Sequence, residues 1–120
     1  MQTKIYSNKV LIGKADLSIS DDSMGVLSGE FIPNKDYLAI REINWKFNST
    51  NNKDFDLWKS LRLNIQLENG YFLHSMGRIS IWDIQEPMEE KIDIEIAGVF
   101  RHLIDDFFKT DPPRLFVEEP

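Results

Sequence analysis

The stretch 61–84, with the sequence LRLNIQLENGYFLHSMGRISIWDI, constrains the fold most strongly, because apolar and polar residues alternate on both sides of an Asn69-Gly70 dipeptide. The apolar residues before the dipeptide recur at a spacing of two and therefore share one face of a strand: Leu61, Leu63, Ile65 and Leu67. Asn-Gly favours a two-residue type I′ turn, because both central residues of that turn need positive φ. We therefore expect a β-hairpin in which Glu68 pairs with Tyr71.

The second strand of this hairpin needs one irregularity. Ile79 and Ile81 stand at odd positions, whereas the core-facing residues before them, such as Met76, stand at even ones. A β-bulge near Gly77 adds one residue and returns both isoleucines to the core face. On the same alternation, Trp82 points away from the core.

The rest of the chain has to complete the sheet, because two strands alone are marginal in water. Alternating apolar residues predict one or two strands within 3–19, with a tight turn at 7–9, and a further strand over 26–32. A third strong strand is expected over 92–96, paired with the second hairpin strand. Gly29 interrupts the strand-like run in which it lies, which predicts a bulge or another backbone passing closely.

Two helices are expected beside the sheet. Asn34 is a suitable N-cap for a helix over 35–42, which stops there because 43–47 alternates like a strand. Apolar residues at spacings of three and four predict an amphipathic helix over 99–109. The apolar tail 114–117 is expected to dock as a short edge strand. Together these elements predict an α+β fold, a mainly antiparallel sheet of about six strands with two helices.

Length and composition fit one domain over residues 1–120. The chain has no run of about 18 apolar residues and no apolar leader, so we expect neither a membrane span nor a secretion signal. It contains no cysteine, which excludes disulfides and thiolate metal sites and fits a reducing compartment. We therefore expect a cytoplasmic protein.

Charge is distributed unevenly along the chain. Residues 1–60 carry eight basic and eight acidic side chains, whereas residues 61–120 carry six basic and twelve acidic ones, so the whole net charge of -6 lies in the second half. An acidic surface repels phosphate backbones, which disfavours nucleic-acid binding, and it attracts basic proteins. The sequence therefore favours a basic protein partner, with simple solubility as the alternative explanation.

The carboxylates of the second half gather around the expected hairpin rim. Lys91 is the only basic residue among them in the sequence. An exposed aromatic residue beside carboxylates is typical of an interface anchor. The candidate partner-binding residues are therefore Trp82, Asp83, Glu86, Glu89, Glu90, Asp93 and Glu95. The alternative interpretation is a sheet edge that carries charge against aggregation.

The remaining chemistry-bearing residues give weak patterns. His74 is expected on the core face opposite Ile65, and His102 on a solvated helix surface. Neither stands in a nucleophile and base arrangement, and two distant histidines do not form a metal-ligand pattern. The glycines give no phosphate loop and no dinucleotide fingerprint. We therefore predict no catalytic residue, no metal site and no cofactor.

The segment Ser20 to Tyr37, SDDSMGVLSGEFIPNKDY, combines an acidic turn, Met-Gly, a second glycine, Phe-x-Pro and a tyrosine. In this order of features it resembles a stretch found in small uncharacterised bacterial proteins. The resemblance covers under a fifth of the chain. It implies a bacterial, cytoplasmic origin and no particular activity.

Three functional hypotheses follow. The first is a non-enzymatic protein-interaction module that presents the acidic rim and Trp82 to a basic protein, of which an immunity protein neutralising a toxin would be one instance by analogy. The second is a small-molecule-binding or hydrolytic domain that uses a cleft between sheet and helix with His74. The third is a homodimer joined through an exposed edge strand.

Overall fold

The first two strands of the computed structural model form a hairpin with a tight turn. Strands β1 (Gln2–Ser7) and β2 (Val10–Asp16) are antiparallel, and Ser7 pairs with Val10. Asn8 and Lys9 between them have φ of 50° and 69°, as both central residues of a type I′ turn require. The tight turn expected at 7–9 is therefore confirmed.

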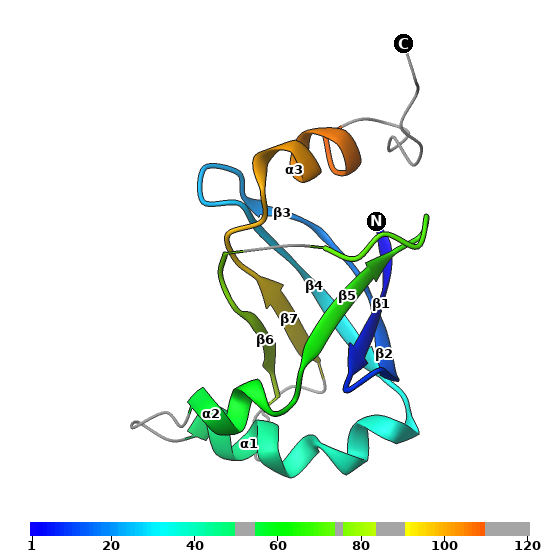
Figure 1. The fold of residues 1–120 in the computed structure, drawn as a ribbon, viewed down its shortest axis with the longest axis vertical. Helices are drawn as coiled ribbons and strands as arrows, with labels where there is room; N and C mark the ends of the chain where they lie inside the picture. Colours follow the sequence, from blue (N-terminus) through cyan, green and yellow to red (C-terminus); the bar gives the residue numbers. More distant parts are fainter. Residues whose placement is uncertain (50–54, 74–75, 84–90, 110–120) are drawn as a thin grey trace.

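The structure describes residues 1–49, 55–73, 76–83 and 91–109. Within them a single antiparallel sheet has the strand order β5-β1-β2-β4-β7-β6, and β3 pairs with β4. The sheet curls into a half-barrel (Figure 1), which confirms the α+β class with a mainly antiparallel sheet. The later strands are β3 (Ser18–Asp21), β4 (Val26–Pro33), β5 (Leu63–Leu67), β6 (Ile79–Trp82) and β7 (Ile92–Ile96).

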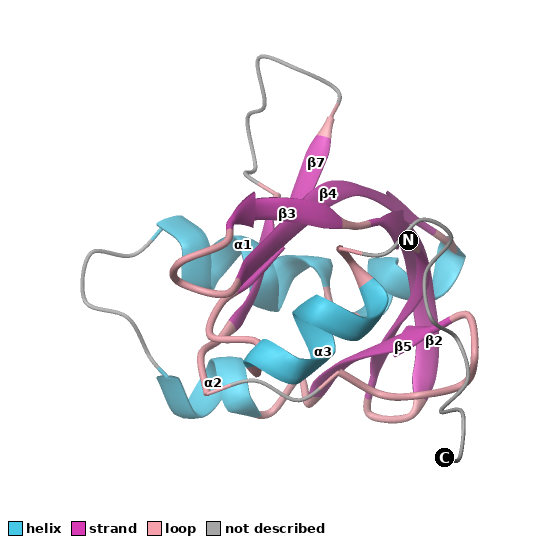
Figure 2. Cartoon of the chain, turned by 90° about the horizontal axis from the view of Figure 1, so that it is seen from above, coloured by secondary structure: helices cyan, strands magenta, loops and turns pink. Residues whose placement is uncertain are grey.

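Helical segments cover the two open ends of the half-barrel (Figures 1 and 2). A 3₁₀ helix η1 (Lys35–Ala39) and helices α1 (Arg41–Ser49) and α2 (Phe55–Lys59) lie at one end, and α3 (Arg101–Phe107) lies at the other. The inward residues of every long strand and of α3 form one core, whose fully buried members include Ile5, Ile12, Leu27, Phe31, Ile65, Ile81, Ile94, Ile96 and Ile104. No helix among the described residues is long and apolar enough to cross a membrane.

The predicted hairpin over 61–84 is wrong in its two-residue type I′ turn, in the pairing of Glu68 with Tyr71, and in its strand pairing. Leu67 donates its N–H to the carbonyl of Tyr71, and Gln66 rather than Leu67 lies opposite Phe72. The loop has three residues, 68–70, and only Gly70 has positive φ, 89°. The chain then crosses to the other side of the half-barrel, where β6 pairs with β7 instead of β5. That β6–β7 pairing was expected, and Ile81 is buried as predicted.

The first predicted helix is also corrected. Asn34 caps η1 as expected, since its side-chain oxygen accepts the N–H of Asp36 at 2.9 Å. The helical region does not end near residue 42, because α1 runs to Ser49. Asn44 and Phe47, three residues apart, are both buried, so the apolar pattern of 43–47 belongs to a helix face and not to a strand. Helix α2 was not predicted.

Gly29 lies where another backbone passes, as expected. A Cβ atom at this position would lie 2.0 Å from the carbonyl oxygen of Asp16, closer than any real contact. Only glycine therefore allows β4 to lie this close to the link between β2 and β3. Helix α3 lies within the predicted range 99–109, and the tail 114–117 falls outside the described residues.

The outer edge of β6 is covered by side chains instead of a neighbouring strand. The carbonyl of Ile79 accepts the indole N–H of Trp58 at 3.2 Å. The carbonyl of Ile81 accepts the side-chain amides of Asn44 at 3.0 Å and Asn48 at 2.8 Å, and the latter amide also reaches the carbonyl of residue 83 at 3.0 Å. Helices α1 and α2 thus supply donors that a further strand would otherwise provide.

Candidate interaction surface

Strands β4, β7 and β6 bring three carboxylates together on the outer side of the sheet. Glu30 lies directly opposite Asp93 on β7, which in turn lies directly opposite Trp82 on β6. Glu95 lies opposite Ser80, one row further along the same side. Directly opposite side chains in antiparallel strands have Cβ atoms about 5 Å apart. We call Glu30, Asp93 and Glu95 the acidic face.

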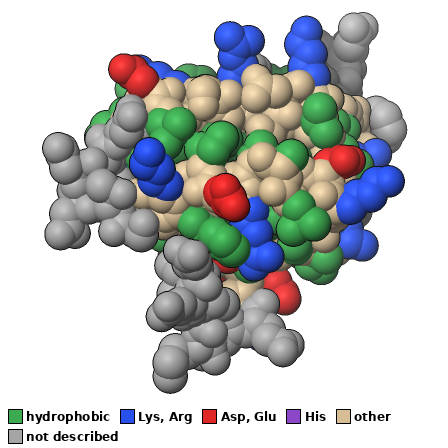
Figure 3. All heavy atoms as spheres, turned by 90° about the horizontal axis from the view of Figure 1, so that it is seen from below, with side chains coloured by type: hydrophobic (Ala, Val, Ile, Leu, Met, Phe, Trp, Pro, Cys, Tyr) green, Lys and Arg blue, Asp and Glu red, His purple; other side chains and the backbone are tan. Residues whose placement is uncertain are grey.

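Among the described residues, the acidic face has no counter-charge in ion-pair contact. In the part of the chain that the structure describes, no Lys, Arg or His nitrogen lies within 4.0 Å of these three carboxylates. Like charges directly opposite each other across two strands are destabilising. Among the described residues that Figure 3 shows at the helical end of the molecule, by contrast, the carboxylates are scattered between Lys, Arg and hydrophobic side chains. The fold therefore tolerates an unbalanced negative charge at one particular place on the sheet.

A groove of about 520 Å³ runs beside the acidic face. Strands β6 and β7 form its floor, and α2 forms one wall. The groove is lined by aromatic and methionine side chains together with one basic and one acidic side chain: Phe55, Trp58, Met76, Arg78, Trp82 and Glu95. Trp82 is 46% exposed, which confirms that it points away from the core. The groove thus offers an apolar contact surface that ends at the acidic face.

The wall formed by α2 is held in place by contacts between aromatic rings and a cation. The guanidinium of Arg78 lies 5.3 Å from the ring centroids of both Phe47 and Phe55. The hydrogen bond from Trp58 to the edge of β6 fixes the same helix. Aromatic faces attract cations within about 6 Å. This part of the groove already shows how its aromatic rings accommodate a basic side chain.

Asp83 is not part of the exposed surface, and its expected place in the acidic rim is corrected. It follows Trp82 and therefore points to the opposite side of the strand, where it is 2% exposed. Its Oδ2 atom accepts the hydroxyl of Tyr37 at 2.7 Å and the Nε–H of Arg41 at 3.0 Å. Asn44 donates to the same tyrosine hydroxyl at 3.1 Å. Asp83 therefore joins β6 to η1 and α1 and is out of a partner's reach.

This buried network changes the acidity of its tyrosine. Burial raises the pKa of Tyr37 well above its ordinary value, and the hydrogen bond to the Asp83 carboxylate raises the pKa further. The hydroxyl therefore stays protonated and keeps donating to the carboxylate. The network connects the helical end to the sheet.

The other predicted residues separate into two groups. Asp93 and Glu95 lie together with Trp82, whereas Glu86, Glu89, Glu90 and His74 fall outside the described residues. His102 is exposed on α3, as expected, and its ring stacks on that of Phe100 with centroids 6.1 Å apart. Within the described ranges, no group of three His, Cys, Asp or Glu side chains is placed to hold a metal ion.

Sequence reasoning missed Glu30 and most of the groove. The alternation of 26–32 places Glu30 on the solvent side of its strand, but nothing local indicates that this strand pairs with β7. The aromatic residues of α2 were likewise not connected with Trp82. These residues come together only through long-range pairing.

No protein-family model, no curated protein and no solved structure matches this chain.

Proposed function

We propose that this chain is a non-enzymatic protein-binding domain whose acidic face and groove bind a basic surface of another protein. The observation that supports this most strongly is the pair Glu30 and Asp93, directly opposite each other without a cation in the described part of the chain. Lysine or arginine side chains of a partner would remove this repulsion. Complementary charge also accelerates association and rejects acidic competitors.

Trp82 gives this surface an anchor as well as a charge. Its exposed ring lies next to Asp93, so a partner's Arg or Lys side chain can lie on the indole while its charged end reaches the carboxylate. Tryptophan is among the residues that most often dominate binding energy at interfaces. Apolar side chains of the partner would fill the adjoining groove.

An inhibitor of a basic toxin, of the immunity-protein type, is the instance that we favour, acting in the cytoplasm. Binding alone fulfils this role, and the acidic face needs no catalytic group for it. The alternative of a small-molecule-binding or hydrolytic site around His74 stays a prediction, because that residue lies outside the described residues. Self-association through an edge strand also stays a prediction.

The test is affinity capture from a lysate of the source cells with two charge-matched variants. The face variant is Glu30→Gln/Asp93→Asn/Glu95→Gln, and the control variant is Asp36→Asn/Glu42→Gln/Asp56→Asn, which changes exposed carboxylates on helical segments. We expect a basic protein bound by the wild type and the control, released by moderate salt, and lost with the face variant. Equal capture by both variants would exclude the acidic face as the binding surface.

The same variants test stability. Because the face variant removes a like-charge pair and buries nothing new, its free energy of unfolding should stay within about 0.5 kcal/mol of the wild type or rise. A large loss of stability in chemical denaturation would show that these carboxylates serve the fold instead of a partner.

A further inference from the structure

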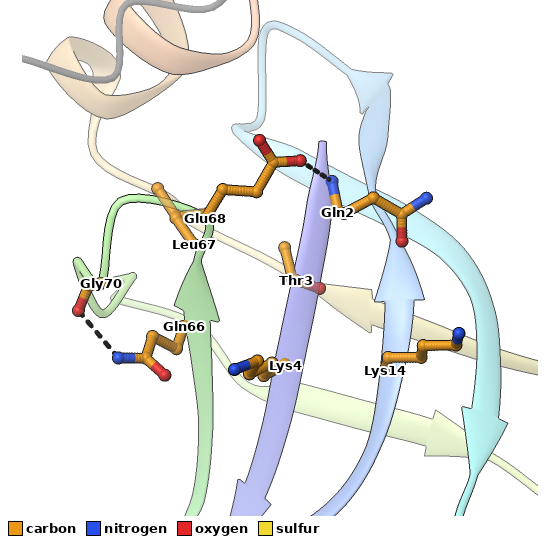
Figure 4. A pocket seen from close by; sticks show the side chains of 8 residues that line it. All are labelled: Gln2, Thr3, Lys4, Lys14, Gln66, Leu67, Glu68 and Gly70. Atoms are coloured by element: carbon orange, nitrogen blue, oxygen red, sulfur yellow. Dashed lines mark hydrogen bonds between the residues drawn. The ribbon is translucent and has the colours of Figure 1, made fainter.

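A second hollow lies on the other half of the sheet, over β5, β1 and β2 (Figure 4). Its volume is about 320 Å³, near the lower limit of small-molecule pockets. The polar side chains around it are Gln2, Lys4, Lys14, Gln66 and Glu68, and Gly70 closes one side. None of these residues belongs to the acidic face or its groove.

Two lysines dominate the charge of this hollow. Lys4 lies directly opposite Lys14 on β2 and directly opposite Gln66 on β5, so all three side chains leave the sheet on the outer side. In the described ranges neither lysine has a carboxylate oxygen within 4.0 Å. Like charges on directly paired positions are destabilising, although the ammonium group of Lys4 points toward Gln66 and that of Lys14 points away from β1 (Figure 4). A bound anion between the two lysines would offset that effect.

The side of the hollow next to β5 is held by hydrogen bonds. The side-chain oxygen of Gln66 accepts the hydroxyl of Tyr6 at 3.0 Å, and its Nε2 donates to the carbonyl of Gly70 at 3.1 Å (Figure 4 shows the latter). The turn that carries Gly70 is fixed in turn by the N–H of Tyr71, which donates to Asn69 Oδ1 at 2.9 Å. A ligand would therefore meet a preorganised wall on this side, and only the lysines would have to be ordered.

The upper rim of the hollow carries the opposite charge. Glu68 accepts the backbone N–H of Gln2 at 3.2 Å, which holds its carboxylate above the two lysines (Figure 4). An anionic group is repelled at this rim and attracted at the lysines. A donor group, such as a hydroxyl or ammonium, has the reverse preference. The hollow is thus polarised along its length.

We propose that this hollow binds a small organic anion, with its phosphate or carboxylate group between Lys4 and Lys14 and a hydroxyl or amino group toward Glu68. The aliphatic stems of the lysines would cover the body of the ligand. This inference does not depend on the proposed function, because the two sites share no residue. Failure of one leaves the other standing.

The experiment is titration of the full chain, at constant ionic strength, with inorganic phosphate, acetate and phosphoethanolamine, followed by the backbone amide signals of Lys4, Lys14 and Gln66. The variant Lys4→Gln/Lys14→Gln is compared with Lys35→Gln/Lys91→Gln, whose exposed lysines lie elsewhere. We expect saturable shifts in the wild type and in the second variant, and at least about tenfold weaker binding in the first. If phosphate binds more tightly than acetate, the natural ligand carries a phosphate group. If acetate binds more tightly, the natural ligand carries a carboxylate group.

Phosphoethanolamine tests the role of Glu68. It should bind more tightly than inorganic phosphate, and Glu68→Gln should abolish that advantage while leaving phosphate binding equal or stronger. Shifts that stay linear with concentration, or that are the same in both lysine variants, would overturn the site. The amide spectra of the variants report at the same time whether each is folded.

Discussion

The two outer edges of the half-barrel are completed in different ways. The β6 edge receives side-chain donors from α1 and α2, from residues 21 to 37 positions away in the chain. The β5 edge receives the backbone of the turn that immediately follows it, through the Leu67 to Tyr71 and Leu73 to Ile65 hydrogen bonds. One edge therefore depends on particular side chains brought from a distance, and the other on local backbone geometry.

This difference decides where the chain is vulnerable. A buried carbonyl without a donor costs free energy, so the helices of the β6 edge have to dock with their amides correctly placed. The β5 edge needs only a turn that can close. Substitutions should therefore have larger and more widespread effects at β6 than at β5.

The largest effect is expected for Asn44→Ala. The amide of Asn44 is buried and donates to both the Ile81 carbonyl and the Tyr37 hydroxyl. Its loss should lower the free energy of unfolding by about 2–3 kcal/mol, measured by urea denaturation. Asn64→Ala, which removes an exposed asparagine from β5, is the control and should cost about 0.5 kcal/mol or less. Equal costs would contradict the proposed difference between the edges.

A smaller, local effect is expected for Gly70→Ala. The nearest atom to an added Cβ is 3.9 Å away, so the cost arises from the φ of 89° and not from a clash. We expect a loss of about 1 kcal/mol. Amide hydrogen exchange should become faster at Leu67 and Leu73 and stay unchanged at Ile81. Faster exchange at Ile81 as well would show that the two edges open together.

The smallest effect is a pH dependence at the β6 side. Because the pKa of Tyr37 is raised by burial, the unfolded chain loses this proton above about pH 10 while the folded chain keeps it. The contribution of Tyr37 to the free energy of unfolding is therefore fully present below the pKa that this residue has in the unfolded chain. It is lost as the pH rises above that value. Between pH 8 and 10.5 the wild type should lose about 0.8 kcal/mol more than Tyr37→Phe. Identical losses would show that the tyrosine titrates normally in the folded state.

The same contrast explains how much of the fold was predictable. The turn at Asn8-Lys9, the cap at Asn34 and the strands β4 and β7 were anticipated because each rests on neighbouring residues. The hairpin over 61–84 was not correctly anticipated, because β5 pairs with β1 and not with β6, although the pairing of β6 with β7 was expected. Alternation fixes which face of a strand is buried, and it does not specify the neighbouring strand.

The candidate site shows the same limit. Trp82, Asp93 and Glu95 were proposed from one stretch of sequence, and the structure places them side by side. Asp83 was included wrongly, although its position next to Trp82 in a strand already implied the opposite orientation. Glu30 was missed, because 63 positions separate it from Asp93 and only the β4–β7 pairing connects them.

The position of β1 between β2 and β5 also has a consequence for biosynthesis. Ile5 lies opposite Gly13 on one side and opposite Ile65 on the other, so its second partner is translated 60 residues after it. At about 5–20 residues per second, synthesis of the 49 residues from the end of β2 to Ile65 takes roughly 2–10 s, and the outer edge of β1 stays unpaired for that time. Lys4 lies on this open strand, and lysine on an exposed strand edge disfavours pairing with another chain.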